Sequence, residues 1–220
     1  MPRPGAGSRA TTVPSDSKAL AALSKSDDFM AGLIAAHGEL DTEERRRGRP
    51  ADAYGALLRS IVGQQLSTKA ARSIYTRLTD HFGGRTPTPR ELLGSDPDDV
   101  RSVGLSRAKV AYLRDLAEHI ERGELDLELL PELSDEDVSE RLTAIKGLGQ
   151  WTVDMFLIFH LGRPDILPVG DLGIRKAVQL GYGLEALPKP AELEAIAEPW
   201  RPYRSLASLY LWSSLDNAPD

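Results

Sequence analysis

The chain has 220 residues, of which 41% are hydrophobic and 27% charged, and its formal net charge is −6. This composition is ordinary for a globular protein, and the length allows one sizeable core or two lobes. The sequence contains no cysteine, which excludes disulfides, thiolate zinc sites and iron–sulfur clusters. Because no apolar run reaches the length of a membrane span or forms the core of a signal peptide, we expect a cytoplasmic protein that does not enter a membrane.

The first fifty residues combine a polar tail with one short helix. Residues 1–16 are rich in Pro, Gly, Ser and Thr, which predicts a disordered tail. The segment 26–38 has the pattern of a helix that begins at Ser26 as N-cap and ends at Gly38. A charged loop follows, and its "RRRGR" run at 45–49 could serve as a DNA-binding arm, although neighbouring acidic residues dilute its charge.

Helical periodicity continues through the middle of the chain. Residues 52–65 place their apolar side chains on one stripe, and a serine or threonine suited to capping precedes each of the next helices. These capping residues are Ser67, Thr88, Ser106 and Ser134. Thr88 and Glu91 also form a capping box. We find no convincing alternating segment typical of strands, so the sequence predicts an all-α fold of about ten short helices.

The stretch "AIKGLGQWTVD", residues 144–154, contains a Gly-Leu-Gly turn between two helices. Gly147 and Gly149 permit positive φ and close backbone approach, so that successive N–H groups can converge at the start of the second helix and bind a phosphate. A tight corner that needs small residues explains the same pattern. A dinucleotide-binding loop does not fit, because no strand precedes the glycines and no third glycine follows.

Two features of the C-terminal part also have two interpretations each. Asp171 precedes the helix "LGIRKAVQL" and is either an N-cap or a functional carboxylate. The segment "WRPYRSLASLYLW" gathers Trp200, Tyr203, Tyr210 and Trp212, which belong either to the core or to a binding pocket.

The ordered segments "GQQLS", "KGLGQWT", "LPVGDLGIRKA" and "WRPYRSLASLYLW" together resemble the helix-hairpin-helix DNA glycosylase superfamily, specifically its 3-methyladenine DNA glycosylase II branch. The resemblance covers about residues 50–215. It implies two helical lobes with an active-site cleft between them: residues 51–162 with the hairpin at 143–152, and residues 17–50 with 163–220. The chain is similar to the compact form of the family, which lacks an N-terminal β-domain.

The resemblance also implies which residues act on DNA. Asp171 of "PVGD" would be the catalytic residue, and Gln65 would be the plug that replaces the flipped nucleotide. The other expected contacts to DNA are Gln64, Ser67, Lys109, Lys146, Gly147 and Gly149. A Na⁺ or K⁺ ion is often held by the hairpin carbonyls, which here would be those of Thr143, Ile145 and Leu148. Two of the DNA contacts have plainer explanations, since Ser67 is also a helix cap and Lys109 could lie on a solvated face.

The base pocket implied by the resemblance contains Trp151, Met155 and Trp212. Lyase-competent relatives carry a lysine where this chain has Trp151, so no amine is present there to form a Schiff base. Relatives often have an aromatic residue where this chain has Met155, which leaves the shape of the pocket open.

We therefore expect a monomeric, monofunctional glycosylase that needs no catalytic cofactor and hydrolyses the N-glycosidic bond of alkylated purines in double-stranded DNA. A non-enzymatic helix-hairpin-helix DNA-binding module is the alternative, but it would need neither the aspartate nor the aromatic cluster. A glycosylase with lyase activity is a third possibility, and the missing lysine at position 151 counts against it.

Overall fold

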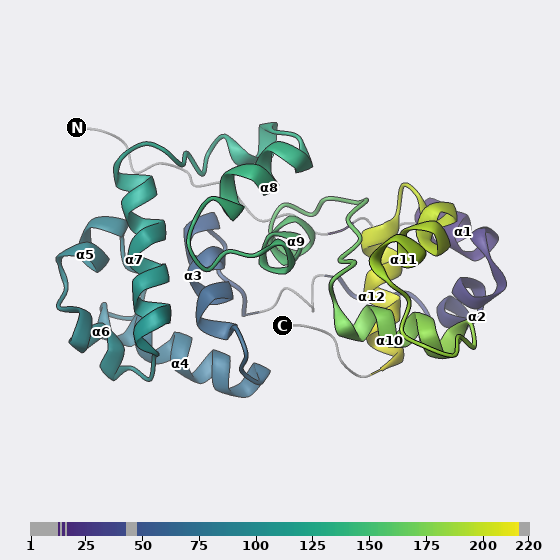
Figure 1. The fold of residues 1–220 in the computed structure, drawn as a ribbon, viewed down its shortest axis with the longest axis horizontal. Helices are drawn as coiled ribbons and strands as arrows, with labels where there is room; N and C mark the ends of the chain where they lie inside the picture. The colour runs from purple at the N-terminus through teal and green to yellow at the C-terminus, as the bar shows by residue number, and fades with distance from the viewer. Residues whose placement is uncertain (1–12, 14, 16, 43–47, 216–220) are drawn as a thin grey trace. The chain divides into compact units, whose positions relative to one another are not determined.

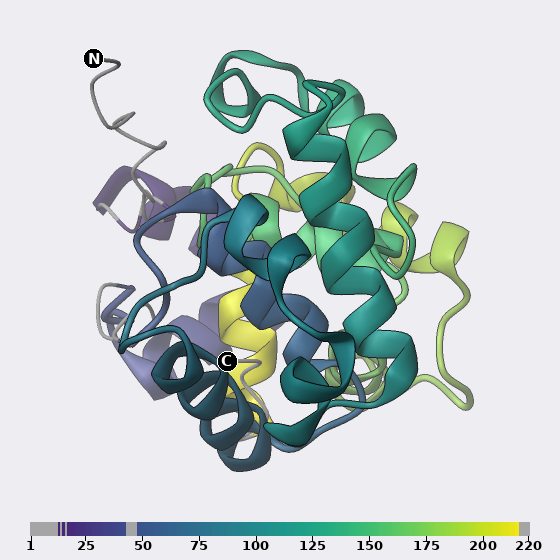
Figure 2. The same ribbon diagram turned by 90° about the vertical axis from the view of Figure 1, so that its left-hand side faces the viewer.

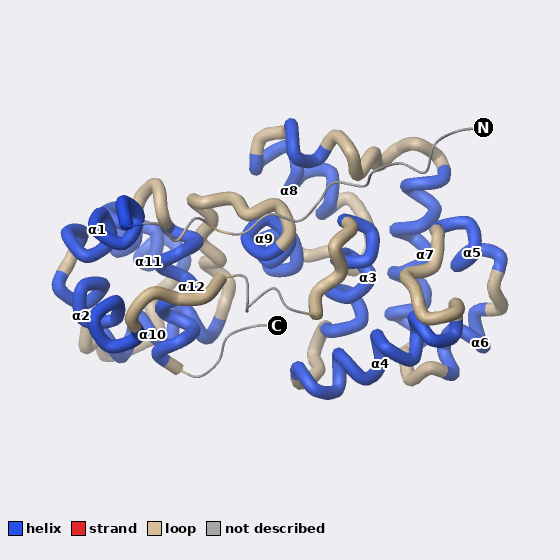
Figure 3. The backbone as a smooth tube through the Cα atoms, turned by 180° about the vertical axis from the view of Figure 1, so that it is seen from behind, coloured by secondary structure: helices blue, strands red, loops and turns tan. Residues whose placement is uncertain are grey.

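The computed structural model describes Val13, Ser15 and residues 17–42 and 48–215. Within these residues the chain forms twelve α-helices and two 3₁₀ turns but no strand, which confirms the all-α prediction (Figures 1 and 3). No helix of the described part is long and apolar enough to span a bilayer. Most of the predicted tail, residues 1–16, and most of the "RRRGR" run lie outside the described residues, although Val13 is described and buried.

The described chain divides into two compact units, and the boundary between them falls within one helix, α9 (Gln150–Phe159). The first unit consists of residues 49–156, and the second contains the described residues up to Gly48 together with 157–215. Besides the start of α9, the helices of the first unit are α3 (Ala53–Gly63), α4 (Thr68–His81), α5 (Pro89–Gly94), α6 (Pro97–Ser102), α7 (Arg107–Glu121) and α8 (Asp135–Thr143).

Helix α7 organises the first unit, because it packs against α3, α5 and α6 (Figures 1 and 2). The predicted apolar stripe of α3 is buried, with Leu57, Leu58 and Ile61 fully covered. All four predicted capping residues accept a hydrogen bond from a backbone N–H of the helix that follows, and Thr88 completes its capping box with Glu91. Local sequence signals therefore set where these helices begin.

The second unit is built around α12 (Arg204–Ser214), whose residues from Ser205 to Trp212 are all buried. This helix packs against α2 (Asp28–His37) and α10 (Leu172–Gly181). The remaining helices of the unit are α1 (Ser17–Ser26), α11 (Pro190–Ala197) and the end of α9. A helix covered on all sides is a core element, so most of the aromatic cluster in "WRPYRSLASLYLW" belongs to the core.

The predicted start of α2 is wrong by one residue. Ser26 ends α1, and the N-cap of α2 is Asp27, whose Oδ1 accepts a hydrogen bond from Met30 N at 2.7 Å. The other carboxylate oxygen accepts hydrogen bonds from Tyr182 Oη at 2.7 Å and Trp200 Nε1 at 2.8 Å. Burial, together with this carboxylate, raises the pKa of Tyr182. Both Ser26 and Asp27 are good capping residues, and the two distant donors favour the aspartate.

We expect Asp27→Ala to lower the free energy of unfolding by about 3 kcal/mol or more. The lost helix cap costs about 1 kcal/mol, and each of the two donors left without an acceptor adds about 1–3 kcal/mol. Urea unfolding followed by circular dichroism measures the change. Asp28→Ala is the matched control, because Asp28 is exposed and its removal should cost no more than about 1 kcal/mol. Equal losses from the two substitutions would contradict the anchoring role of Asp27.

Candidate active site

Asp171, the predicted catalytic residue, lies at the N-terminus of α10 and is 9% exposed. Its Oδ1 accepts hydrogen bonds from Ile174 N at 2.8 Å and from Trp212 Nε1 at 3.0 Å. The side chain is therefore an N-cap, as the simpler interpretation predicts, and it also has a partner in α12. These two donors fix the orientation of the carboxylate, which lies at the N-terminus of the helix.

Trp212 is only 1% exposed, and its indole stacks on Phe159 with ring centroids 5.8 Å apart. Gly173 allows this arrangement, because a Cβ at that position would lie 3.1 Å from Asp171 Oδ1 and 3.4 Å from Trp212 Cδ1. The structure thus uses the indole to hold the carboxylate. A role of Trp212 as a pocket wall stays a prediction.

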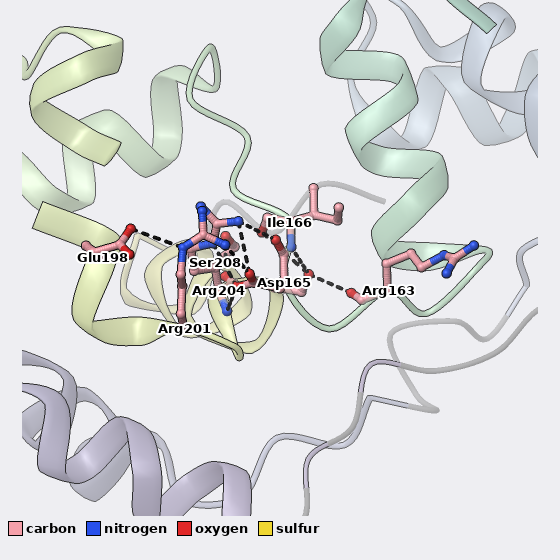
Figure 4. Close-up of polar contacts among 8 residues, drawn as sticks. Arg163, Asp165, Ile166, Glu198, Arg201, Arg204 and Ser208 are labelled. Carbon is pink, nitrogen blue, oxygen red and sulfur yellow. Dashed lines mark hydrogen bonds and ion pairs between the residues drawn. The ribbon is translucent and has the colours of Figure 1, made fainter. Parts of the chain in front are cut away.

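The loop before Asp171 is held by the first turn of α12, as Figure 4 shows. Ser205 Oγ accepts a hydrogen bond from Ile166 N at 2.9 Å and donates one to Arg163 O at 2.7 Å. Asp165 accepts hydrogen bonds from Arg204 Nε at 2.7 Å and from Arg201 Nη1 at 2.5 Å. One helix therefore anchors both the beginning of this loop and, through Trp212, its end at Asp171.

The residues of this anchor could not be predicted from the sequence. Ser205 is completely buried although its side chain is polar, and it pairs with backbone groups about forty positions away. The opposite charges of "RPD" at 163–165 and "YRS" at 203–205 are a weak signal, since no spacing rule links two such distant segments. Only the fold brings them together.

The hairpin lies in the first unit, between the end of α8 and the start of α9. Its two glycines differ. Gly147 has a φ of +83°, and a Cβ there would lie 2.3 Å from the Tyr112 ring, so the fold itself requires this glycine. Gly149 has no positive φ, and an added Cβ would meet no atom within 4 Å. Packing within the described fold therefore does not require a glycine at position 149. Close approach of a ligand to this backbone would be a separate reason for it.

The loop between α3 and α4, predicted to carry the plug, also lies in the first unit. Gln65 has a φ of +59°, the only positive value for a residue other than glycine in the described chain, and it is exposed. Gln64 precedes it, and its Nε2 donates a hydrogen bond to Gly147 O at 2.5 Å. Ser67 is exposed and caps α4. A strained residue in an exposed loop is typical of functional sites.

Lys109 does not lie on a purely solvated face. Its Nζ donates hydrogen bonds to Val62 O at 2.6 Å and to Gln64 O at 2.7 Å, and partial burial lowers its pKa. The hairpin lysine differs, because the side chain of Lys146 is exposed and its backbone N–H donates to Asp115 Oδ2 at 2.9 Å.

The remaining predicted residues differ in exposure. Trp151 is 40% exposed at the start of α9, whereas Met155 is 5% exposed. Ile145 and Leu148 are buried, and Ile145 O accepts a hydrogen bond from Leu148 N at 3.1 Å. A carbonyl oxygen has a second lone pair, so this hydrogen bond leaves Ile145 O able to accept another partner, and the binding of a monovalent cation here stays a prediction.

Comparisons with known proteins agree with this arrangement of motifs. The sequence pattern of the HhH-GPD superfamily base excision DNA repair protein matches residues 58–202. DNA-3-methyladenine glycosylase 1 of Schizosaccharomyces pombe is 37% identical over 165 residues, which cover 74% of this chain and 72% of that protein. The Bacillus subtilis relative YfjP is 34% identical over 169 residues, and the match spans 59% of its length.

Solved structures of relatives have the same fold. The Schizosaccharomyces pombe 3-methyladenine DNA glycosylase Mag1, in complex with abasic DNA, superposes with a TM-score of 0.82 at 34% identity, covering 93% of this chain and 100% of that one. A DNA-3-methyladenine glycosidase from Bacillus halodurans gives a TM-score of 0.78 at 36% identity, covering 91% and 90% of the two chains. The chain therefore belongs to the helix-hairpin-helix superfamily of base excision DNA repair proteins.

Proposed function

We propose that the protein is a monofunctional DNA-3-methyladenine glycosylase, which hydrolyses the N-glycosidic bond of alkylated purines in double-stranded DNA. The observation that carries this proposal is the rigidly held carboxylate of Asp171, with Ile174 N and Trp212 Nε1 on one oxygen. The names of the relatives support the same activity. We further propose that the enzyme acts as a monomer in the cytoplasm.

The chemistry of alkylated purines needs little more than this carboxylate. A base such as 3-methyladenine is already cationic, so it leaves without a strong general acid. Positive charge then develops on the sugar, and a fixed carboxylate near C1′ stabilises it and can orient the attacking water. Asp171 would fill this role, since its position is set before the charge appears.

The target nucleotide must leave the helical stack before Asp171 can act on it. Gln65 would fill the resulting gap, because it is exposed and held in a left-handed conformation next to the hairpin. The exposed indole of Trp151 would stack on the flipped base. Attraction between a cation and an aromatic face contributes about 0.5–2 kcal/mol, which favours a charged alkylated base.

Binding to the DNA backbone would depend on the hairpin more than on net charge. An acidic chain can bind DNA when backbone N–H groups and a few cations are gathered in one place. The exposed Lys146 and the open backbone at Gly149 have this character. Residues Thr143, Ile145 and Leu148 would hold a Na⁺ or K⁺ ion through their carbonyls, and the ion would add positive charge next to a phosphate.

The first test of this function is Asp171→Asn. Asparagine keeps an oxygen that can accept both hydrogen bonds, so the loop should stay folded while the negative charge is lost. We expect base release to fall by about 100-fold or more, with binding to a duplex that contains an abasic-site analogue nearly unchanged. Single-turnover release is measured on duplexes carrying 3-methyladenine, 7-methylguanine or 1,N6-ethenoadenine.

The control for this test is Asp28→Asn, an exposed aspartate far along the chain, which should release bases like the wild type. Turnover retained by Asp171→Asn would refute the assignment of the catalytic residue. Intact DNA binding without base release by the wild type would favour the non-enzymatic module. Borohydride treatment should yield no covalent complex with lesion DNA, because a crosslink requires a Schiff base.

The second test compares the two glycines of the hairpin. Gly149→Ala should leave the melting temperature unchanged, since its Cβ meets no atom, but should weaken binding to damaged and undamaged duplexes alike. Gly147→Ala should destabilise the fold, because alanine is strained at positive φ and would collide with Tyr112. Fluorescence anisotropy gives the affinities and thermal unfolding gives the stabilities. Wild-type affinity in Gly149→Ala would mean that DNA does not approach this backbone closely.

A further inference from the structure

Three residues of α7 face the two loops that carry the expected DNA contacts. They are Lys109, Tyr112 and Asp115, which are spaced three apart and therefore lie along one side of the helix. We call the loop of residues 63–67 the plug loop. Lys109 contacts the plug loop and the end of α3, whereas Tyr112 and Asp115 contact the hairpin.

The contact of Lys109 fixes the backbone just before the strained Gln65. Val62 O and Gln64 O lie at the C-terminus of α3, where carbonyls lack helical partners and a cation is favourable. Both accept a hydrogen bond from Lys109 Nζ, at 2.6 and 2.7 Å. A non-glycine residue at positive φ persists only when its surroundings hold it there. The ammonium is one such constraint on Gln65.

The hairpin is attached to the same side of α7. Asp115 Oδ2 accepts a hydrogen bond from Lys146 N at 2.9 Å, and the Tyr112 ring occupies the space where a side chain of residue 147 would begin. The Gln64 side chain then joins the plug loop to the hairpin, because its Nε2 donates to Gly147 O. These contacts link α7, the plug loop and the hairpin into a closed ring.

We propose that Lys109 is a positioning residue that holds the plug loop and the hairpin in fixed register, rather than a contact to DNA phosphate. Its role is to keep Gln65 ready for insertion, so that binding energy is not spent on ordering the loop. The inference rests on the proposed function, since it takes Gln65 as the plug. In this role Lys109 contacts carbonyls of its own protein, whereas the resemblance to the family implied a contact to DNA.

The two roles of Lys109 differ in their dependence on salt. A lysine that neutralises one phosphate contributes about 0.9 to the slope of log affinity against log salt concentration, and its removal weakens binding to every duplex. A lysine that only positions the plug loop leaves this slope unchanged. Removal of such a lysine instead weakens the step in which Gln65 takes the place of the flipped nucleotide.

The experiment uses Lys109→Met, which keeps a long apolar stem and removes the ammonium, in the full chain. Affinities for an undamaged duplex and for a duplex with a tetrahydrofuran abasic-site analogue are measured at several NaCl concentrations. A 2-aminopurine beside the analogue reports insertion of the plug. We expect a wild-type salt slope and wild-type affinity for undamaged DNA, with affinity for the abasic duplex lowered about tenfold and a weaker 2-aminopurine signal.

Two matched variants complete the test. Lys146→Met removes an exposed hairpin lysine and should lower the salt slope by about one unit. Gln64→Met breaks the link to Gly147 O and should weaken the 2-aminopurine signal as Lys109→Met does, and the double variant should lose less of that signal than the sum of the two because they act on one loop. Lys109→Gln, which removes the charge but keeps a hydrogen-bond donor, decides the matter if Lys109→Met does not fold.

A salt slope lowered by about one unit in Lys109→Met, with the 2-aminopurine signal unchanged, would overturn the proposal and make the lysine a phosphate contact. Wild-type behaviour in every measurement would also overturn it. Neither readout requires base release, so failure of the positioning role is distinguishable from failure of the glycosylase activity.

Discussion

The hydrogen bond from Trp212 Nε1 to Asp171 Oδ1 joins residues 41 positions apart and places a carboxylate at the start of α10. A carboxylate stabilises a developing positive charge most effectively when it does not have to move as the charge appears. In the proposed function Asp171 would meet this requirement, because the second unit holds its carboxylate in one orientation. Helix α12 is buried along its whole middle part, so the indole that it carries has little freedom to move.

The same helix holds the other end of the loop that leads to Asp171. Ser205 exchanges hydrogen bonds with Arg163 and Ile166, and Arg204 binds the carboxylate of Asp165. Buried and partly buried polar contacts of this kind favour one conformation, because an alternative that left their donors or acceptors without partners would cost free energy. Trp200, Tyr210 and Trp212, which the sequence assigns either to the core or to a pocket, are buried and contribute to this rigid core.

In the first unit, one helix holds two loops in position. Its helix α7 contacts both the plug loop and the hairpin, and Gln64 joins the two loops directly. A net charge of −6 is compatible with the proposed DNA binding, since backbone N–H groups can bind a phosphate without a positively charged side chain. Lys109 donates its hydrogen bonds to carbonyls of its own chain.

The sequence by itself determined the helical class, the starts of most helices and the order of the motifs that indicates the superfamily. Caps at Ser67, Thr88, Ser106 and Ser134 could be predicted because each involves a backbone N–H only three residues away. The Gly-Leu-Gly turn and the aspartate before α10 were visible for the same local reason.

Tertiary structure alone decided how these features are used. It selected Asp27 over Ser26 through Tyr182 and Trp200, and it directed Lys109 toward carbonyls up to 47 residues away. It also separated the two hairpin glycines, since the Tyr112 ring excludes a side chain at Gly147, whereas a Cβ at Gly149 would meet no described atom within 4 Å beyond its chain neighbours. Such contacts follow no spacing rule, because they depend on which helices pack together, and packing is fixed by the whole core.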